Sequence, residues 1–237
     1  MDGSSRVDTV SARLTIPVLH AVTNDEIVGR PDFLDRARAV MRAMAGRGAL
    51  HLRAPRMMDE RAGALVEIAL TLAEEQERTD GWLVINDRVD IALIVCARGV
   101  QLTGRSLEVG DAAQVVVRAL GNSAPPTVGA AIGASVHSLE EAIAARLAGA
   151  SWGVAHAQTK RDKARGPDDE SRALLGQLVR FGGIPIVAIG GIVPEHVTTL
   201  RRLGVHGVAA IRGIWDSEHS ESAVIDYLSA YDSEVGR

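Results

Sequence analysis

The chain has 237 residues, a formal net charge of −4 and one cysteine, Cys96. This length suffices for one large hydrophobic core, and a composition of 46% apolar but only 3% aromatic residues predicts a core of small aliphatic side chains. A single cysteine excludes a disulfide framework and favours a cytoplasmic location. Neither a basic block nor an apolar run of membrane-spanning length is present, which argues against nucleic acid and membranes as partners.

The first 14 residues are polar and lack the apolar stretch of a secretory signal. We expect residues 1–14 to form a disordered or loosely attached tail. Strand-like and helix-like segments then alternate to the end of the chain without a break in composition. Residues 15–237 are therefore predicted to form a single domain.

Eight units follow the tail, each a short apolar run succeeded by a stretch of helical periodicity. In chain order, the first four pair a strand at 17–23 with a helix at 32–46, a strand at 49–53 with a helix at 59–78, a strand at 82–86 with a helix at 87–96, and a strand at 99–103 with a helix near 111–120. The last four pair a strand near 130–136 with a helix from 138, a strand at 152–157 with a helix near 169–180, and strands within 186–192 and 207–214 with helices from about 194 and 220.

Eight such units in a chain of this length predict an α/β fold of the (β/α)8 TIM barrel type. A doubly wound open sheet is the competing architecture. Local signals agree, because Ser138 and Glu141 have the spacing of a helix capping box and Pro194 suits a first helical turn. The charged loop after the sixth strand, residues 160–169, is a candidate lid.

Glycine segments in the last two units predict a phosphate site. The loops after strands seven and eight of such barrels hold a phosphate, because glycine lets backbone N–H groups approach an anion that a helix N-terminus also attracts. Gly190, Gly191 and Gly213 are the candidates, and Arg212 adds positive charge. The alternatives are tight packing for the glycines and a surface salt bridge for Arg212.

Histidines stand at two further strand ends, where barrels place their active sites. His137 ends the fifth strand, and its imidazole is a candidate proton donor and acceptor near neutral pH. The alternatives are a helix cap or packing beneath a loop. His156 is a second candidate at the end of strand six, whereas His20 and His51 lie inside strands and are interpreted as core histidines.

Strands two to four contribute four candidates for binding the substrate. Arg53 is a candidate anion clamp, with an ion pair to Asp87 as the alternative. Asp87 is a candidate for binding a metal or a substrate hydroxyl, and it is also a favoured N-cap for the helix that follows. Asn86 and Gln101 complete the set.

Six segments occur in a recognisable order over nearly the whole chain after the tail. They are 19–23 (LHAVT), 50–53 (LHLR), 86–93 (NDRVDIAL), 99–102 (GVQL), 135–142 (SVHSLEEA) and 188–192 (AIGGI). Together they resemble the thiamine-phosphate synthase superfamily, and within it the thiazole tautomerase (TenI-like) branch. No single segment is decisive, but their sequence and spacing together are fairly specific.

The synthase branch of this superfamily couples a pyrimidine pyrophosphate to a thiazole phosphate, and it requires magnesium and cations for the pyrophosphate. Asp87 matches its first metal-binding aspartate. Its Arg-Glu-Lys motif after strand two reads Arg53-Ala54-Pro55 here, and its Gly-Gln-Glu-Asp motif after strand four reads Thr103-Gly104-Arg105-Ser106. The lysine and the second metal-binding aspartate are thus missing, and Arg212 replaces the serine usual after strand eight. Arg56, next in the chain after Pro55, is the candidate substitute for the lysine.

The tautomerase branch aromatises a carboxylated thiazole phosphate by moving a proton, without a metal. Its acid/base histidine matches His137, although synthases also carry a histidine there. The resemblance therefore favours a thiazole tautomerase, an isomerase of thiamine biosynthesis that uses no cofactor, with Arg53 holding the substrate carboxylate. The alternatives are a thiamine-phosphate synthase, which is a Mg²⁺-dependent transferase, and a non-catalytic binder of thiazole or thiamine phosphate. The expected partner is a small phosphorylated heterocycle, and homo-oligomer formation is left open.

Overall fold

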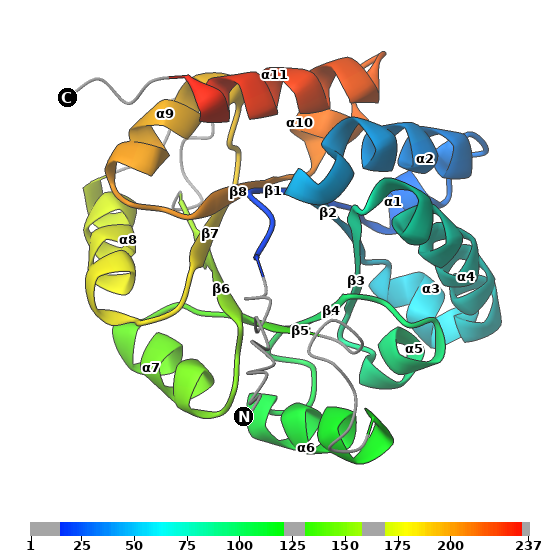
Figure 1. The fold of residues 1–237 in the computed structure, drawn as a ribbon, viewed down its shortest axis with the longest axis horizontal. Coiled ribbons are helices and arrows are strands. Elements are labelled where there is room, and N and C mark those ends of the chain that lie inside the picture. The colour runs from blue at the N-terminus through cyan, green and yellow to red at the C-terminus, as the bar shows by residue number, and fades with distance from the viewer. Residues whose placement is uncertain (1–14, 121–130, 158–168, 234–237) are drawn as a thin grey trace, which may run out of the picture.

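The computed structural model describes residues 15–120, 131–157 and 169–233. Its eight parallel strands form one closed barrel, in which neighbours in sequence are neighbours in space, and helices surround it (Figure 1). The predicted TIM barrel is confirmed, and the doubly wound sheet is wrong because the sheet closes on itself. The predicted tail and all but the last residue of the predicted lid lie outside the described residues.

Every strand overlaps its predicted segment. The strands are β1 (Leu19–Val22), β2 (Gly48–Leu52), β3 (Trp82–Asn86), β4 (Gly99–Leu102), β5 (Ala131–Ser135), β6 (Trp152–His156), β7 (Ile186–Ile189) and β8 (Gly207–Ala210). The barrel closes where β1 pairs with β8, with Leu19 opposite Val208 and Ala21 opposite Ala210. Parallel strands that are buried on both faces are continuous apolar runs, which is why the sequence locates them well.

Eight helices correspond to the predicted ones. They are α2 (Phe33–Met44), α4 (Ala62–Thr79), α5 (Val89–Ile94), α6 (Val109–Leu120), α7 (Leu139–Leu147), α8 (Asp169–Phe181), α9 (Pro194–Arg202) and α11 (Ser220–Asp232). A short 3-10 turn, η1 (Ala45–Arg47), follows α2. The predicted helix over 59–78 is interrupted at Arg61, whose backbone is not helical. Cys96, expected inside a helix, is exposed and lies beyond the end of α5.

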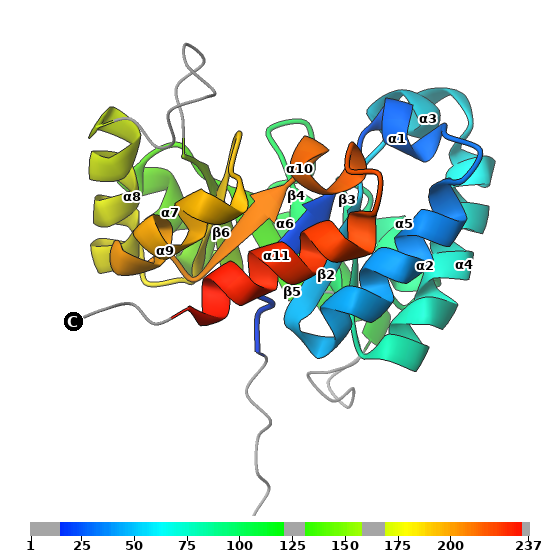
Figure 2. The same ribbon diagram turned by 90° about the horizontal axis from the view of Figure 1, so that it is seen from above.

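Three short helices that directly follow strands are not predicted by the sequence: α1 (Asp25–Val28), α3 (Pro55–Glu60) and α10 (Arg212–Trp215). Figure 2 shows all three at the same end of the barrel. Because they follow β1, β2 and β8, this is the end at which the strands finish and at which barrel enzymes place their active sites. Pro55 stands in the first turn of α3, a position that tolerates proline.

Two apolar layers stabilise the barrel. The larger lies between strands and helices and includes Met41 and Leu72. The smaller fills the barrel interior and includes Trp82 and Trp152, whose rings meet edge to face at 6.3 Å. A Cβ atom at Gly133 would overlap the Trp152 indole, so glycine at this position lets the ring cross the interior beneath the strand ends.

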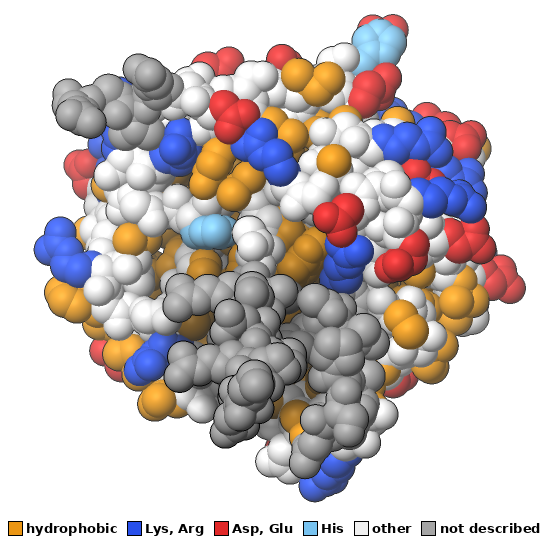
Figure 3. All heavy atoms as spheres, in the orientation of Figure 1, with side chains coloured by type: hydrophobic (Ala, Val, Ile, Leu, Met, Phe, Trp, Pro, Cys, Tyr) orange, Lys and Arg blue, Asp and Glu red, His pale blue; other side chains and the backbone are white. Residues whose placement is uncertain are grey.

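The surface shows no strong bias of charge on the face seen in Figure 1. Acidic and basic side chains are interspersed around it, without a large patch of one sign (Figure 3). Within the described ranges, no helix combines the length and the apolar character needed to cross a bilayer.

Candidate active site

Two cavities adjoin at the end of the barrel where the strands finish. The first, of about 840 Å³, is lined mainly by the loops after β7 and β8 and is called the rim cavity here. The second, of about 290 Å³, is lined by residues at the ends of β1 to β8 and is called the barrel cavity. Four residues line both cavities, namely His156, Ile189, Ala209 and Ile211. One ligand can therefore extend from the first cavity into the second.

The rim cavity has the backbone expected of a phosphate site. Gly190 and Gly191 line it with φ angles of 116° and 59°, in the left-handed region that favours glycine. The loop that they begin leads into α9 at Pro194, so a helix N-terminus borders the cavity. Arg212 and Gly213 line it from α10. The structure thus brings together all four residues predicted to bind phosphate.

The alternative explanation for Arg212, a surface salt bridge, is not observed. Its side chain is exposed, and no carboxylate of the described residues forms an ion pair with it. A guanidinium at the edge of a cavity with backbone N–H donors raises the local positive potential, which favours an anionic ligand.

The barrel cavity gathers most of the other predicted residues. Five of the six line it: Arg53, Asn86, Gln101, His137 and His156. They come from the ends of β2 to β6 and converge because parallel strands of a barrel finish at the same end. The sixth, Asp87, lines neither cavity.

His137 is held by a glutamate one helical turn further along the chain. The Oε2 atom of Glu141 accepts the backbone N–H of His137 at 2.7 Å and lies 3.1 Å from its Nδ1. Because a carboxylate accepts hydrogen bonds, Nδ1 carries the hydrogen and Nε2 is left as the proton acceptor. The imidazole, 66% exposed, is therefore oriented and chemically available.

Ser138, rather than His137, caps α7. The Ser138 hydroxyl accepts the Glu141 N–H at 3.2 Å, as the predicted capping box requires. The returning contact differs from the prediction, because the Glu141 carboxylate bonds to the N–H of His137 instead of that of Ser138. Sequence patterns did not identify Glu141 as a partner of His137, although a spacing of four residues at a helix start is the signal that could have done so.

Arg53 supplies positive charge to the barrel cavity. Thr23 fixes its backbone, since the Thr23 hydroxyl accepts the Arg53 N–H at 2.8 Å and donates to the Arg53 carbonyl at 3.0 Å. The half-buried guanidinium forms no ion pair with a carboxylate in the described parts of the chain, so the alternative of a pair with Asp87 is not observed. Its charge is available to an anionic group of a ligand.

Asn86 also lines this cavity, but its side-chain oxygen is buried. Its Oδ1 atom is buried and has no hydrogen-bond partner among the described residues. Leaving such a group unpaired costs about 1–3 kcal/mol. Gln101, by contrast, is engaged: its Oε1 accepts the Trp152 indole N–H at 3.0 Å and its Nε2 donates to the Leu102 carbonyl at 3.2 Å.

Asp87 ties the loops after β3 and β4 together. Its Oδ1 accepts the Thr103 N–H at 3.0 Å and the Thr103 hydroxyl at 2.7 Å, and the Ser106 hydroxyl also donates to it. The helix-cap alternative is wrong, because Arg88 occupies the N-cap of α5. The φ angle of Asp87, 64°, lies in the left-handed region, which Asp and Asn tolerate better than most residues.

One oxygen of the candidate metal-binding carboxylate of Asp87 is already engaged by the protein. Mg²⁺ requires a nearly octahedral shell of oxygen ligands, and one oxygen of Asp87 already serves three donors from Thr103 and Ser106. In the portion of the chain that the structure describes, no three histidine, cysteine, aspartate or glutamate side chains are grouped to hold a metal.

His20 and His51 form a hydrogen-bonded pair that lines part of the barrel cavity. His20 Nδ1 lies 2.7 Å from His51 Nε2, and His20 Nε2 lies 3.0 Å from the carbonyl of Pro17. A carbonyl only accepts, so His20 donates through Nε2 and accepts the Nε2–H of His51. Burial lowers the pKa of His20 to about 4. Burial, with His20 alongside, also holds the pKa of His51 well below its usual value. Both are thus satisfied, neutral core histidines, as interpreted, that also line the cavity.

Comparison with known proteins assigns the family. The model of the TMP-TENI family, described as thiamine monophosphate synthase, matches residues 19–214. Thiamine-phosphate synthase from Pyrococcus furiosus is 33% identical over 176 residues, which cover 73% of this chain and 78% of that protein. The enzyme of the same name from Anaeromyxobacter dehalogenans is 32% identical over 215 residues, covering 89% of this chain and 87% of that protein.

Solved structures support the same assignment. Thiamine phosphate pyrophosphorylase from Pyrococcus furiosus aligns with a TM-score of 0.72 and 26% identity, covering 92% of this chain and 97% of that one. A 3-keto-L-gulonate-6-phosphate decarboxylase from Vibrio cholerae aligns with a TM-score of 0.68 and 14% identity, covering 92% and 98%, which shows a shared fold alone. The named relatives are synthases, so they favour the alternative expectation, a synthase, over a tautomerase. By the extent of the family match and the identity of these relatives, the chain belongs to the thiamine monophosphate synthase (TMP-TENI) family.

Proposed function

We propose that this protein is an isomerase that aromatises a carboxylated thiazole phosphate by transferring a proton, as a step of thiamine biosynthesis. The observation that carries the proposal is the orientation of His137 by Glu141 at a cavity that also contains the unpaired charge of Arg53. A phosphate in the adjoining rim cavity and a heterocycle in the barrel cavity would fit one substrate.

In this reaction the phosphate binds at Gly190, Gly191 and Gly213, with Arg212 beside it. The carboxylate of the substrate pairs with Arg53, which places the ring in the barrel cavity. His137 Nε2 takes a proton from one carbon of the non-aromatic ring system and returns it to the other, so no atom or electron is gained or lost overall. A positioned general acid–base of this kind typically accelerates a reaction by about 10²–10⁴-fold.

The residues around the expected pyrophosphate and metal positions support the isomerase over the transferase. Pro55 begins α3 where the synthase motif has a lysine, and Ser106 donates a hydrogen bond to Asp87 where the synthase motif has a second aspartate. Pro55 supplies no positive charge for a pyrophosphate, and the uncharged Ser106 hydroxyl is a weaker metal ligand than an aspartate carboxylate.

A thiamine-phosphate synthase is the second candidate, and the names of the relatives favour it. Two assays distinguish the isomerase from the transferase. In the first, the purified protein receives the non-aromatic thiazole carboxylate phosphate tautomer in EDTA, and the ring absorbance is followed. In the second, it receives the pyrimidine pyrophosphate and the thiazole phosphate with Mg²⁺, and thiamine phosphate is measured.

Turnover in the first assay alone supports the isomerase. Turnover in the second assay alone replaces the proposal with the transferase. Activity in neither assay, together with tight binding of thiazole phosphate, would identify a binder. His219→Gln is a suitable control for histidine variants, because His219 is exposed and lines neither cavity.

A further inference from the structure

The proposed function requires the loops after β7 and β8 to hold one phosphate together. We infer that Tyr227, on α11, is a positioning residue that fixes the loop after β7 against α10 and thereby sets the shape of the phosphate site. This inference rests on the phosphate site of the proposed function and extends it to a residue outside both cavities.

The hydroxyl of Tyr227 lies between the two halves of the rim cavity. It donates a hydrogen bond of 2.6 Å to the carbonyl of Ile192, in the loop that begins with the two glycines. On its other side, a Cβ atom at Gly213 would overlap this same oxygen, and it would also lie 3.5 Å from the Ile192 carbonyl. The Tyr227 oxygen therefore bridges the β7 loop and the start of α10.

Gly213 is required because a side chain would not fit at this position, not because its backbone has a positive φ angle. Its φ is not among the positive values found for five other glycines, so alanine could adopt its conformation. What excludes a side chain is the Tyr227 hydroxyl. Because Gly213 has no side chain, the Tyr227 hydroxyl can occupy the space that a Cβ atom at position 213 would need.

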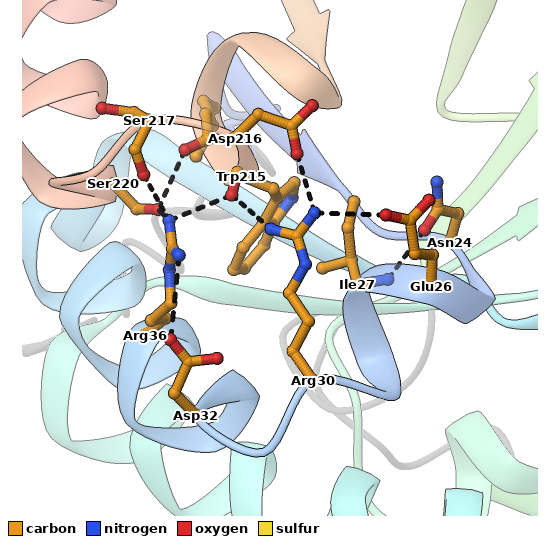
Figure 4. A network of polar contacts seen from close by, with 11 residues as sticks. Asn24, Glu26, Ile27, Arg30, Asp32, Arg36, Trp215, Asp216, Ser217 and Ser220 are labelled. Atoms are coloured by element: carbon orange, nitrogen blue, oxygen red, sulfur yellow. Dashed lines mark hydrogen bonds and ion pairs between the residues drawn. The ribbon is translucent and has the colours of Figure 1, made fainter.

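The far end of α10 is fixed by two arginines, Arg30 just before α2 and Arg36 within α2, the helix that packs against α11 (Figure 4). Arg30 and Arg36 both donate to the carbonyl of Trp215, at 2.6 and 3.0 Å. Arg36 also donates to the Ser217 carbonyl at 2.5 Å and to the Ser220 hydroxyl at 2.6 Å. A helix of one turn is not stable alone, so α10 depends on these anchors at its end and on Tyr227 at its start.

Tyr227 is suited to a permanent donor role. The side chain is 1% exposed, and burial, with Glu195 nearby, raises its pKa to about 12. The hydroxyl consequently keeps its hydrogen near neutral pH and can donate it to the Ile192 carbonyl.

The same helix provides a matched control. Tyr231 also donates a hydrogen bond from its hydroxyl to a backbone carbonyl, that of His206, at 3.0 Å. His206 immediately precedes β8, so this bond lies at the opposite end of the barrel from the cavities. Removal of either hydroxyl deletes one tyrosine-to-carbonyl bond of α11, but only Tyr227 touches the phosphate loops.

The experiment compares wild type, Tyr227→Phe and Tyr231→Phe by calorimetric titration with inorganic phosphate. We expect Tyr227→Phe to raise the dissociation constant about three- to tenfold, as for the loss of one hydrogen bond, and Tyr231→Phe to leave it within twofold of wild type. In turnover, Tyr227→Phe should raise KM and leave kcat nearly unchanged, because the phosphate contact is equal in ground and transition states.

Equal phosphate affinity of wild type, Tyr227→Phe and Tyr231→Phe overturns the inference and leaves the proposed function intact. A wild-type protein that binds no phosphate overturns both. Gly213→Ala supplies a second test: its affinity loss should be several-fold smaller in the Tyr227→Phe background than in wild type, because the overlapping oxygen is gone. An equal loss in both backgrounds contradicts the inference.

Discussion

One carboxylate oxygen of Glu141 contacts His137 twice, at 2.7 Å from its backbone nitrogen and 3.1 Å from its Nδ1. The contact fixes both the ring and the chain that carries it. It also leaves Nε2 without a hydrogen, as a base requires. The residue predicted to transfer the proton is therefore positioned by a partner from the first turn of α7, the helix that follows it.

Glu141→Gln tests this pair. The amide keeps a neutral acceptor but loses the negative charge that stabilises the protonated imidazole during transfer, so we expect kcat to fall about tenfold or more with little change in KM. Steady-state kinetics across pH 5–9 would measure it. Glu140→Gln is the control, since the neighbouring Glu140 is exposed and the contacts to His137 come from Glu141. An equal effect of both variants would contradict the pairing.

Asp87 is expected to contribute to stability rather than to chemistry. Asp87→Ala removes the acceptor of three hydrogen bonds from Thr103 and Ser106, and we predict a loss of about 2 kcal/mol in the free energy of unfolding. Asp87→Asn keeps an acceptor and tolerates the left-handed backbone, so its loss should be below about 1 kcal/mol. Urea unfolding measures both.

The same Asp87→Asn variant discriminates between reactions. Proton transfer without a metal should persist in it at near wild-type rate. A coupling reaction that depends on Mg²⁺ bound at this carboxylate should be abolished. Loss of the isomerase activity in a variant that remains folded would count against the structural role of Asp87.

The buried histidines predict a dependence of stability on acid. Burial lowers the pKa of His20 from 6.5 to about 4 in the folded protein. Between these values the unfolded chain binds a proton that the folded protein does not, so the free energy of unfolding decreases as the pH falls. The difference corresponds to about 3 kcal/mol, present above pH 6.5 and lost by pH 4.

Urea titrations at pH 7.5, 5.5 and 4.5 would measure this decline. A variant with His20→Gln and His51→Gln should show a shallower decline, whereas His219→Gln should behave as wild type. If the free energy of unfolding of the wild type stays constant between pH 7.5 and 4.5, His20 and His51 are not a buried neutral pair.

The glycines of the β7 loop should be specifically required. Gly190→Ala places a Cβ at φ 116°, and we predict a destabilisation of about 1–2 kcal/mol with at least a tenfold loss of phosphate affinity. Gly176→Ala, in the middle of α8 with open space around it, should instead raise stability by about 0.5–1 kcal/mol. Thermal unfolding and phosphate titration measure the two effects. Unaltered phosphate binding in Gly190→Ala would remove this loop from the site.

The barrel was predictable because its strands are continuous apolar runs with glycine and polar residues at their ends. The convergence of Arg53, Asn86, Gln101, His137 and His156 was also predictable, because the topology places all strand ends together. The helices α1, α3 and α10 were not, because four to six residues show no periodicity. Their formation depends on tertiary contacts, such as those of Arg30 and Arg36 to Trp215.

Individual side-chain roles were harder to predict than positions. The sequence allowed Asp87 as a cap or a ligand, but its bonds to Thr103 and Ser106 cross between loops that only the fold brings together. The Tyr227 hydroxyl, which lies between the Ile192 carbonyl and Gly213, likewise brings together residues far apart in sequence. No local pattern encodes such contacts.

The central claim is that the imidazole of His137 carries the proton, and chemical rescue tests it most directly. The rate of thiazole carboxylate tautomer aromatisation would be measured in EDTA for wild type and His137→Ala, with and without added imidazole. We predict a fall in kcat of about 10²–10⁴-fold in His137→Ala, with phosphate binding retained and part of the rate restored by imidazole. A His137→Ala variant that turns over the tautomer at the wild-type rate would contradict the account.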